Sequence, residues 1–367
     1  MPGWLRSLGD GLQSHLRRFK SGPWLHTCLV LVRRETCFGE DDLKVAVIGM
    51  GKMGLVHSCV LSVVPSVEVV ALCEKSLMIR RFLKKMFTGA KIVDDAWKLA
   101  DLDLDAVYVT TPIPSHYSIA KTVYLKKVAR NLFVEKTLTE NFKESKELCG
   151  LADCHGGVNM VGYLRRFYVT FGKARDLLSR GAIGELHSFS VHAFSSDFLG
   201  SSQGSAASLA RGGVLRDLGC HALDLALWYF GDLRIRPNSA SSPNADHGED
   251  VLSFGTSNSH GLEGKFDISW CIAGYRMPEV GISVKGSNGT IDVSDDLVHL
   301  REYNGRESTW YRHDLNDNVP FWLALPEYYR EDLHFVESVK AGSNGSPDFL
   351  AAAKVDELIA EVEKLWE

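Results

Sequence analysis

In the stretch Val45-Ala-Val-Ile-Gly49-Met-Gly51-Lys-Met-Gly54, a short apolar run leads directly into three spaced glycines. The spacing is G-x-G-x-x-G, between a predicted strand and a predicted helix. The first glycine allows a tight turn, the second lets a pyrophosphate approach the backbone, and the third lets the helix pack closely on the strand. The amino terminus of such a helix also favours an anion. The stretch therefore predicts a binding site for a nicotinamide dinucleotide, NAD or NADP.

Later residues define the rest of this predicted site. Glu74 ends the next predicted strand, where an acid can accept hydrogen bonds from both ribose hydroxyls of NAD. Lys75 follows at once and would suit a 2′-phosphate, so NAD is favoured and NADP stays open. The expected cofactor contacts are Gly49, Met50, Gly51, Lys52, Met53, Gly54, Glu74, Lys75, Thr110, Thr111, Pro112, His116, Glu135 and Lys136.

The pattern around the glycine turn alternates short β-branched runs with amphipathic stretches, which is typical of a parallel sheet flanked by helices. We therefore predict a Rossmann domain over residues 43–164. Its expected strands are 44–48, 67–72, 91–93, 106–110, 131–134 and 159–161.

The rhythm changes near residue 165, where we predict a second, α+β domain over 165–367 with a mostly antiparallel sheet. A helix near 171–179 should precede strands at 186–194, 251–254, 262–270, 280–284 and 289–293. A closing helix, 348–366, is a candidate to pack back on the first domain. The Ser- and Gly-rich stretch 195–213 has no periodicity and is either a loop over the substrate or a solvated connector.

Composition excludes several classes of protein. At 367 residues the chain is long enough for two cores, and its 45% hydrophobic and 24% charged residues are ordinary for globular proteins. A formal net charge of -5 offers no basic field for nucleic acid. Residues 1–42 are expected to be a poorly ordered extension, either a targeting segment or residues upstream of the true start. Its apolar run is too short to span a membrane, so a cytoplasmic protein is expected.

The eight cysteines contain no C-x-x-C pair, so we predict reduced thiols and no metal site. Cys149, Cys154 and His155 lie close in sequence, but without a second ligand pair they do not form a metal-binding pattern.

Two further segments carry candidate catalytic residues. Lys136 ends a strand at the crevice edge, where an ammonium can hydrogen-bond a reacting oxygen. Asp217 and His221 are four residues apart on a predicted helix, so their side chains should meet, and a carboxylate beside histidine raises the affinity of the imidazole for a proton. Loss of hydride from an alcohol needs such a base. Asp224 is expected to stabilise the helix or support the site.

Four ordered motifs together resemble the glucose-fructose oxidoreductase, inositol dehydrogenase and rhizopine-catabolism (Gfo/Idh/MocA) family over about residues 43–366. They are G-x-G-x-x-G at 49–54, T-P-x-x-x-H at 111–116, E-K at 135–136 and G-G-x-x-x-D-x-G-x-H at 212–221. The resemblance implies a Rossmann domain, an α/β domain whose open-faced sheet makes a homodimer or homotetramer, and NAD(P)-dependent oxidoreduction of a sugar or cyclitol. It also implies that His221 is the acid/base, that Lys136 polarises the hydroxyl, and that Asp217 orients substrate or histidine.

Several positions qualify this resemblance. Thr137 replaces the proline of the family's E-K-P, and Arg216 stands where the family has a small or apolar residue; we expect Arg216 to face solvent rather than to read an anionic substrate. Tyr163, Arg165 and Arg166 fall in the family's segment after the sixth strand. We expect Tyr163 and Arg165, with Lys136, Asp217 and His221, to bind substrate; salt bridging is the alternative for the arginines.

The expected function is hydride transfer between a secondary hydroxyl of a small polyhydroxy substrate, namely a sugar, sugar nucleotide or cyclitol, and NAD or NADP. Two alternatives stay open. One is glycoside hydrolysis through transient oxidation by bound NAD, and the other is a catalytically silent dinucleotide-sensing protein.

Overall fold

The structure is a computed structural model that describes residues 42–200, 212–237, 239, 250–275, 277–315, 326–343 and 345–365. The expected extension up to residue 41 and residues 201–211 of the Ser- and Gly-rich stretch lie outside these ranges. The chain divides into two compact units. The first takes the described residues of Met1–Glu135, Leu148–Met160 and Val319–Asp348, and the second takes those of Lys136–Glu147, Val161–Asn318 and Phe349–Glu367.

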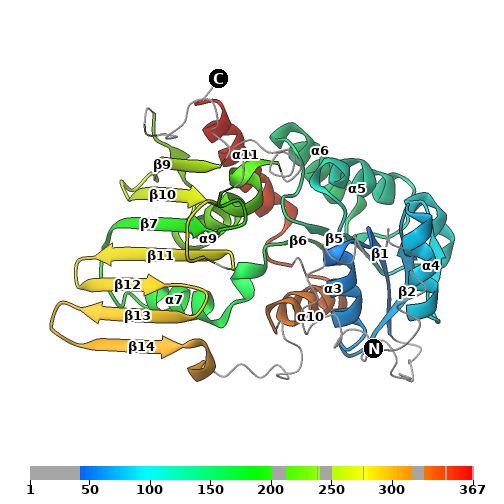
Figure 1. Cartoon of the computed structure of the whole chain (residues 1–367), viewed down its shortest axis with the longest axis horizontal. Coiled ribbons are helices and arrows are strands. Elements are labelled where there is room, and N and C mark those ends of the chain that lie inside the picture. Colours follow the sequence, from blue (N-terminus) through cyan, green and yellow to red (C-terminus); the bar gives the residue numbers. More distant parts are fainter. Residues whose placement is uncertain are drawn as a thin grey trace. The chain divides into compact units, whose positions relative to one another are not determined.

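The first unit is built on a six-stranded sheet in the order β3-β2-β1-β4-β5-β6 (Figure 1). The pairs from β3 to β5 are parallel. Runs of consecutive buried residues, as in β4, fit strands that are covered on both faces. The strands are β1 (Leu43–Ile48), β2 (Val67–Cys73), β3 (Lys91–Val93), β4 (Ala106–Val109), β5 (Asn131–Glu135) and β6 (Asn159–Gly162).

Helices connect these strands. Helix α3 begins straight after the glycine turn, and the hydroxyl of Ser76 caps α4 by accepting a hydrogen bond from the main-chain nitrogen of Ile79 at 3.4 Å. The helices are α3 (Lys52–Leu61), α4 (Leu77–Met86), η2 (Ala96–Leu102), η3 (Ile113–Ser115), α5 (His116–Leu125), α6 (Phe142–His155) and α10 (Pro326–Ala341).

The second unit contains an eight-stranded sheet in the order β14-β13-β12-β11-β7-β10-β9-β8. It is antiparallel except that β10 runs parallel to β7. The strands are β7 (Leu186–Phe194), β8 (Arg234–Ile235), β9 (Val251–Ser257), β10 (Glu263–Ser269), β11 (Glu279–Gly286), β12 (Gly289–Val293), β13 (Leu297–Glu302) and β14 (Glu307–Tyr311).

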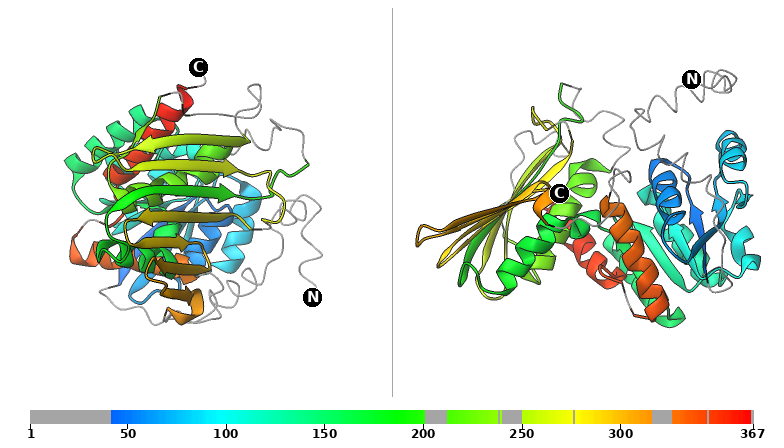
Figure 2. Two further views of the ribbon diagram at one scale, coloured as in Figure 1. Left: turned by 90° about the vertical axis from the view of Figure 1, so that its left-hand side faces the viewer. Right: turned by 90° about the horizontal axis from the view of Figure 1, so that it is seen from below.

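Helices of this second unit pack on one face of its sheet, where α7 and α9 lie (Figure 2). Alternate residues of β9 are buried, as expected for a strand with one covered face. The helical segments are η4 (Leu164–Phe167), α7 (Val169–Ser179), η5 (Leu215–Gly219), α9 (Cys220–Phe230), η7 (Arg312–Asp314) and α11 (Phe349–Glu363).

The predicted fold class is confirmed: a parallel Rossmann sheet and a mostly antiparallel sheet are both present. The sequence patterns missed β8, β13, β14 and α10. The closing helix, α11, groups with the second unit, and it is the unpredicted α10 that groups with the first. Within the described parts of the chain, no helix combines the length and apolar character needed to cross a membrane.

Candidate active site

The glycine turn between β1 and α3 has the geometry that its sequence predicts. Gly49 has a φ of +95°, which favours glycine, and a Cβ there would strike Thr111. A Cβ on Gly54 would strike the carbonyl oxygen of Gly49, so this glycine is needed for close helix–strand packing. Nothing lies within 4 Å of a Cβ built on Gly51, which leaves space beside the helix amino terminus. A pyrophosphate fits this arrangement, with Gly51 as the point of closest approach.

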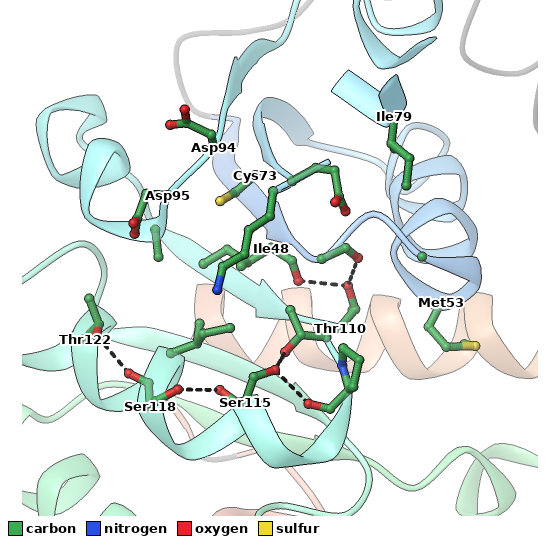
Figure 3. A pocket seen from close by; sticks show the side chains of 18 of the residues that line it. Ile48, Met53, Cys73, Ile79, Asp94, Asp95, Thr110, Ser115, Ser118 and Thr122 are labelled. Carbon is green, nitrogen blue, oxygen red and sulfur yellow. Dashed lines mark hydrogen bonds between the residues drawn. The ribbon is translucent and has the colours of Figure 1, made fainter. Parts of the chain in front are cut away.

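A cavity of about 690 Å³ opens beside this turn within the first unit. Figure 3 shows Asp94 and Asp95 on one side of it and the hydroxyls of Ser115, Ser118 and Thr122 on another. Its size is in the range of small-molecule sites. The predicted cofactor residues that line it are Gly49, Gly51, Lys52, Met53, Glu74, Lys75, Thr110, Thr111 and Pro112. Sequence reasoning missed Ile48, Cys73, Ile79, Asp94, Asp95, Ala96, Ser115, Ser118, Ile119 and Thr122.

The carboxylate of Glu74 is tied to the backbone of this site. It accepts hydrogen bonds from the main-chain nitrogens of Met50 (3.0 Å) and Ser76 (2.7 Å). An anion is thereby fixed at the end of β2, where a ribose would bind and where a 2′-phosphate would be repelled. Lys75 lines the same cavity, so a cation is also present there.

Other predicted cofactor residues do not line this cavity. Met50 is 1% exposed, and Gly54 acts in packing. His116 is fully buried, with its Nε2 2.7 Å from the main-chain oxygen of Thr111, so it braces the segment after β4. Glu135 contacts His57, and Lys136 belongs to the second unit.

Lys136 is anchored by the second unit. Its Nζ donates hydrogen bonds to the main-chain oxygen of Asp217 at 2.6 Å and to Oδ1 of the same residue at 2.9 Å. Both side chains are less than one-fifth exposed. Two of the predicted catalytic residues therefore meet.

The expected contact between Asp217 and His221 is replaced by this pairing with Lys136. Asp217 lies in η5, a π-helical turn, which breaks the α-helical spacing assumed for an i, i+4 pair. The Nδ1 atom of His221 is buried and has no hydrogen-bond partner among the described residues. Our inference that Asp217 raises the proton affinity of His221 is therefore wrong.

The surroundings of His221 instead lower its pKa well below the ordinary histidine value. Burial is the main cause, and the positive charges of Arg165 and Lys136 add to it. Tyr163 packs edge-on against the imidazole, with ring centroids 6.2 Å apart, and its hydroxyl is buried without a hydrogen-bond partner among the described residues. These surroundings therefore favour the neutral form of the His221 imidazole.

Two neighbouring arginines are held in salt bridges inside the second unit. Arg165 contacts Asp295 at 3.3 Å and donates to the main-chain oxygen of Pro278 at 2.9 Å. Arg166 makes a bidentate pair with Asp224 at 2.7 and 2.8 Å. The expected substrate contacts of Tyr163 and Arg165 stay predictions.

Arg216 does not face solvent as we expected. Its guanidinium lies 2.7 Å from a carboxylate oxygen of Glu363 on α11, and its side chain is 12% exposed. The side chain of Arg216 is long enough to reach α11, whereas the neighbouring Asp217 contacts Lys136.

The segment that follows Lys136 is also held by α11. Asp356 accepts hydrogen bonds from the hydroxyl of Ser145 (2.6 Å) and the main-chain nitrogen of Thr139 (3.3 Å). Burial raises the pKa of Asp356 to about 7. Thr137, which replaces the family's proline, is fully buried, and the Lys136–Thr137 peptide bond is cis.

Among the residues that the structure describes, Cys73, Cys154, Cys220 and Cys271 are free thiols. His155 contacts the main-chain oxygen of Leu151 and stacks on Tyr124. No cluster of possible metal ligands occurs in the part of the chain that the structure describes. Cys28 and Cys37 lie outside it.

Sequence reasoning missed one polar cluster entirely. His57 on α3 lies between Glu135 of β5 and Asp332 of α10, and its side chain is fully buried. A histidine on an otherwise buried helix face was the available signal, but its partners are 78 and 275 residues away in sequence.

Two models of known protein families match this chain, one over each of its two predicted domains. Residues 43–163 match the model of an oxidoreductase family with an NAD-binding Rossmann fold, and residues 171–292 match the GFO/IDH/MocA C-terminal domain. A crystal structure of an NAD binding oxidoreductase from Klebsiella pneumoniae has the same fold, with a TM-score of 0.77 and 20% identity, over 89% of this chain and 97% of that one.

Two curated relatives are each 26% identical to this chain over the matched residues. The chain is 26% identical to D-glucoside 3-dehydrogenase of Escherichia coli (strain K12), over 62% of this chain and 63% of that protein, so the match spans less than two thirds of this relative. It is also 26% identical to scyllo-inositol 2-dehydrogenase (NADP(+)) of Bacillus subtilis (strain 168), over 84% of this chain and 95% of that one. With both domain models matched in order, the chain belongs to the Gfo/Idh/MocA family of NAD-binding oxidoreductases.

Proposed function

We propose that this protein is an NAD(P)-dependent dehydrogenase that moves hydride between the nicotinamide and a secondary hydroxyl of a sugar, sugar nucleotide or cyclitol. The observation that carries the proposal is the pairing of Lys136 with Asp217 in the same unit as His221, whose pKa is lowered. Relatives named as glucoside and inositol dehydrogenases support the substrate class.

The residues of the second unit suit the proton transfer that accompanies such a reaction. Bound NAD supplies the hydride acceptor. The lowered pKa of His221 favours its neutral form, which can take the hydroxyl proton as hydride leaves the carbon. Lys136, oriented by Asp217, supplies a positive charge that stabilises developing negative charge on the substrate oxygen.

The first unit would hold the dinucleotide. Gly49 and Gly51 would accommodate the pyrophosphate at the start of α3, and Glu74 would accept hydrogen bonds from the ribose hydroxyls. Because the Glu74 carboxylate is held in place by two backbone hydrogen bonds, we propose that NAD is preferred to NADP.

The test is a screen of purified protein with sugars, inositols and UDP-sugars, following the nicotinamide absorbance. We expect a substrate-dependent change, and a loss of roughly two or more orders of rate in both His221→Ala and Lys136→Ala. Intact turnover in both variants would overturn the mechanism. Retained cofactor with glycoside cleavage and no net NADH would favour hydrolysis instead, and cofactor binding with no turnover on the whole panel would favour a silent binding protein.

We also propose self-association through the open face of the eight-stranded sheet. This face carries polar pairs, such as Ser283 with Asp292 (2.5 Å) and Arg301 with Asp292 (2.7 Å). An interface here would be polar and should weaken at high salt. Light scattering at low and high salt, with Arg301→Glu as the disrupting variant, tests it.

A further inference from the structure

The buried imidazole of His57 bridges two carboxylates. Its Nδ1 lies 2.7 Å from Oδ1 of Asp332, and its Nε2 lies 2.9 Å from Oε1 of Glu135. The three side chains come from α3, α10 and β5, which are distant in sequence. We refer to His57, Glu135 and Asp332 as the His57 triad.

The geometry of the triad places a carboxyl oxygen at each nitrogen of the imidazole. A neutral imidazole has one N–H and could donate to only one of two ionised carboxylates, leaving a lone pair against the other oxygen. The imidazolium donates to both. Burial by itself lowers the pKa of His57, but the charges and hydrogen bonds of Asp332 and Glu135 outweigh it and hold this pKa well above the ordinary value.

The environment of the triad makes its charge balance important. The rings of Tyr108, Phe133 and Tyr328 surround the imidazole with centroids 5.1 to 5.7 Å away, so little water can screen the charges. The ionisable groups around it are Tyr108 of β4, Glu135 of β5, and Glu331 and Asp332 of α10, and Glu327 and Arg330 form a pair on the same helix. His57 is the basic partner of this acidic surrounding.

The triad joins the two places where the cofactor-binding unit must be held accurately. His57 lies on α3, six residues after Gly51 of the pyrophosphate turn, and Glu135 is the last residue of β5, directly before Lys136. A shift of α3 relative to β5 would therefore disturb both the turn and the residue that leads into the lysine.

We propose that His57 is a positioning residue whose bound proton fixes α3 against β5 and α10, so that the affinity for the dinucleotide falls when the triad loses that proton. The affinity effect rests on NAD binding alone, whereas an effect on turnover through Lys136 rests on the proposed dehydrogenase function. The direction of the pH effect follows from the raised pKa of His57. The stabilisation that its bound proton provides is complete below pH 6.5, and it is lost as the pH rises through the pKa of His57 in the folded protein.

The experiment measures the Kd for NADH by fluorescence titration, without substrate, from pH 6.5 to about 10. It uses the full-length wild type, Asp332→Asn, and Asp153→Asn as an exposed control on α6 of the first unit. In wild type and control, Kd should rise roughly tenfold or more toward high pH. In Asp332→Asn the amide can donate to Nδ1 of a neutral imidazole while Nε2 donates to Glu135, so Kd should stay nearly flat.

A second comparison distinguishes a loss of charge balance in the triad from simple misfolding of a variant. His57→Gln should bind NADH at least roughly tenfold more weakly at pH 6.5, because a neutral amide leaves buried carboxylate charge unbalanced. His57→Gln with Asp332→Asn should recover most of that loss. Parallel pH profiles in wild type and Asp332→Asn, or no recovery in the double variant, would overturn the proposal. Neither readout involves turnover, so failure of the dehydrogenase proposal would remain a separate result.

Discussion

Lys136 and Asp217 are joined by two hydrogen bonds, one from the lysine ammonium to the carboxylate (2.9 Å) and one to the main-chain oxygen (2.6 Å) of the same residue. The main-chain contact makes the position of the ammonium depend on the π-helical turn as well as on the aspartate side chain. Asp217 is thus a partner of the lysine rather than of the histidine, and burial, together with the two nearby cations, lowers the pKa of His221.

Removal of the Lys136 ammonium should lower the catalytic rate more than it lowers the stability of the fold. We expect Lys136→Ala to lose roughly two or more orders in kcat, since a positioned charge at a reacting oxygen is removed. Asp217→Asn should lose roughly tenfold, because it keeps the main-chain contact and removes the charge. Steady-state kinetics check both, with the exposed Lys143→Ala as control. Equal rates in Lys136→Ala and the control would contradict the role.

The lowered pKa of His221 predicts that the acid limb of the pH–rate profile lies at unusually low pH. The imidazole should stay neutral below pH 6.5, so kcat/KM for alcohol oxidation should persist there and fall only at lower pH. For stability, the contribution of the neutral imidazole is complete above pH 6.5 and is lost as pH falls through the depressed value. Comparison of pH–rate and pH–stability profiles with His221→Gln checks this. An acid limb centred above pH 6.5 that disappears in the variant would contradict it.

The glycine turn offers a matched pair of substitutions. Gly54→Ala should destabilise the first unit, because the new Cβ would meet the Gly49 carbonyl oxygen, whereas Gly51→Ala should fold normally because nothing lies within 4 Å of its Cβ. Gly51→Ala should nevertheless bind NADH more weakly, since the methyl would occupy the approach of the pyrophosphate. Thermal melts and NADH titrations separate the effects, and unchanged affinity in Gly51→Ala would place the pyrophosphate elsewhere.

Charge at Glu74 should set the choice of cofactor. Glu74→Gln removes repulsion toward a 2′-phosphate, so the preference for NAD over NADP should fall roughly tenfold, about 1.4 kcal/mol. Titration with both reduced cofactors measures the ratio, and the exposed Asp101→Asn is the control. If Glu74→Gln leaves the ratio unchanged, Lys75 or another lining residue decides it.

The buried pair of Arg166 and Asp224 should dominate the stability of its surroundings. Asp224 is 1% exposed, so Asp224→Ala would leave a buried guanidinium without its carboxylate and should cost about 3–5 kcal/mol in the free energy of unfolding. Asp232→Ala removes an exposed partner of Lys354 and should cost little. Urea denaturation of both variants is the measurement, and similar midpoints would contradict the assignment.

Local sequence accounts for most of the fold. The strand at 106–109 is buried at every position because it is covered on both faces, and 186–194 alternates because one face is covered. By contrast, β14 alternates only between exposed and half-buried positions, so its sequence shows no clear alternation of apolar residues. Helix α10 was not predicted because its buried positions include the acidic residues Glu327, Glu331 and Asp332, so its buried face does not stand out as apolar in the sequence.

The sequence by itself determined the dinucleotide turn, because the G-x-G-x-x-G spacing between a strand and a helix is a pattern that spans only about ten residues. It also identified Lys136, Asp217 and His221 as candidates, though it paired them wrongly by assuming α-helical spacing. Only the tertiary structure decided that Asp217 serves Lys136, that Arg216 reaches Glu363 and that His57 binds two carboxylates. Such ion pairs depend on distances between elements that are far apart in the chain, and a residue pattern carries no record of those distances.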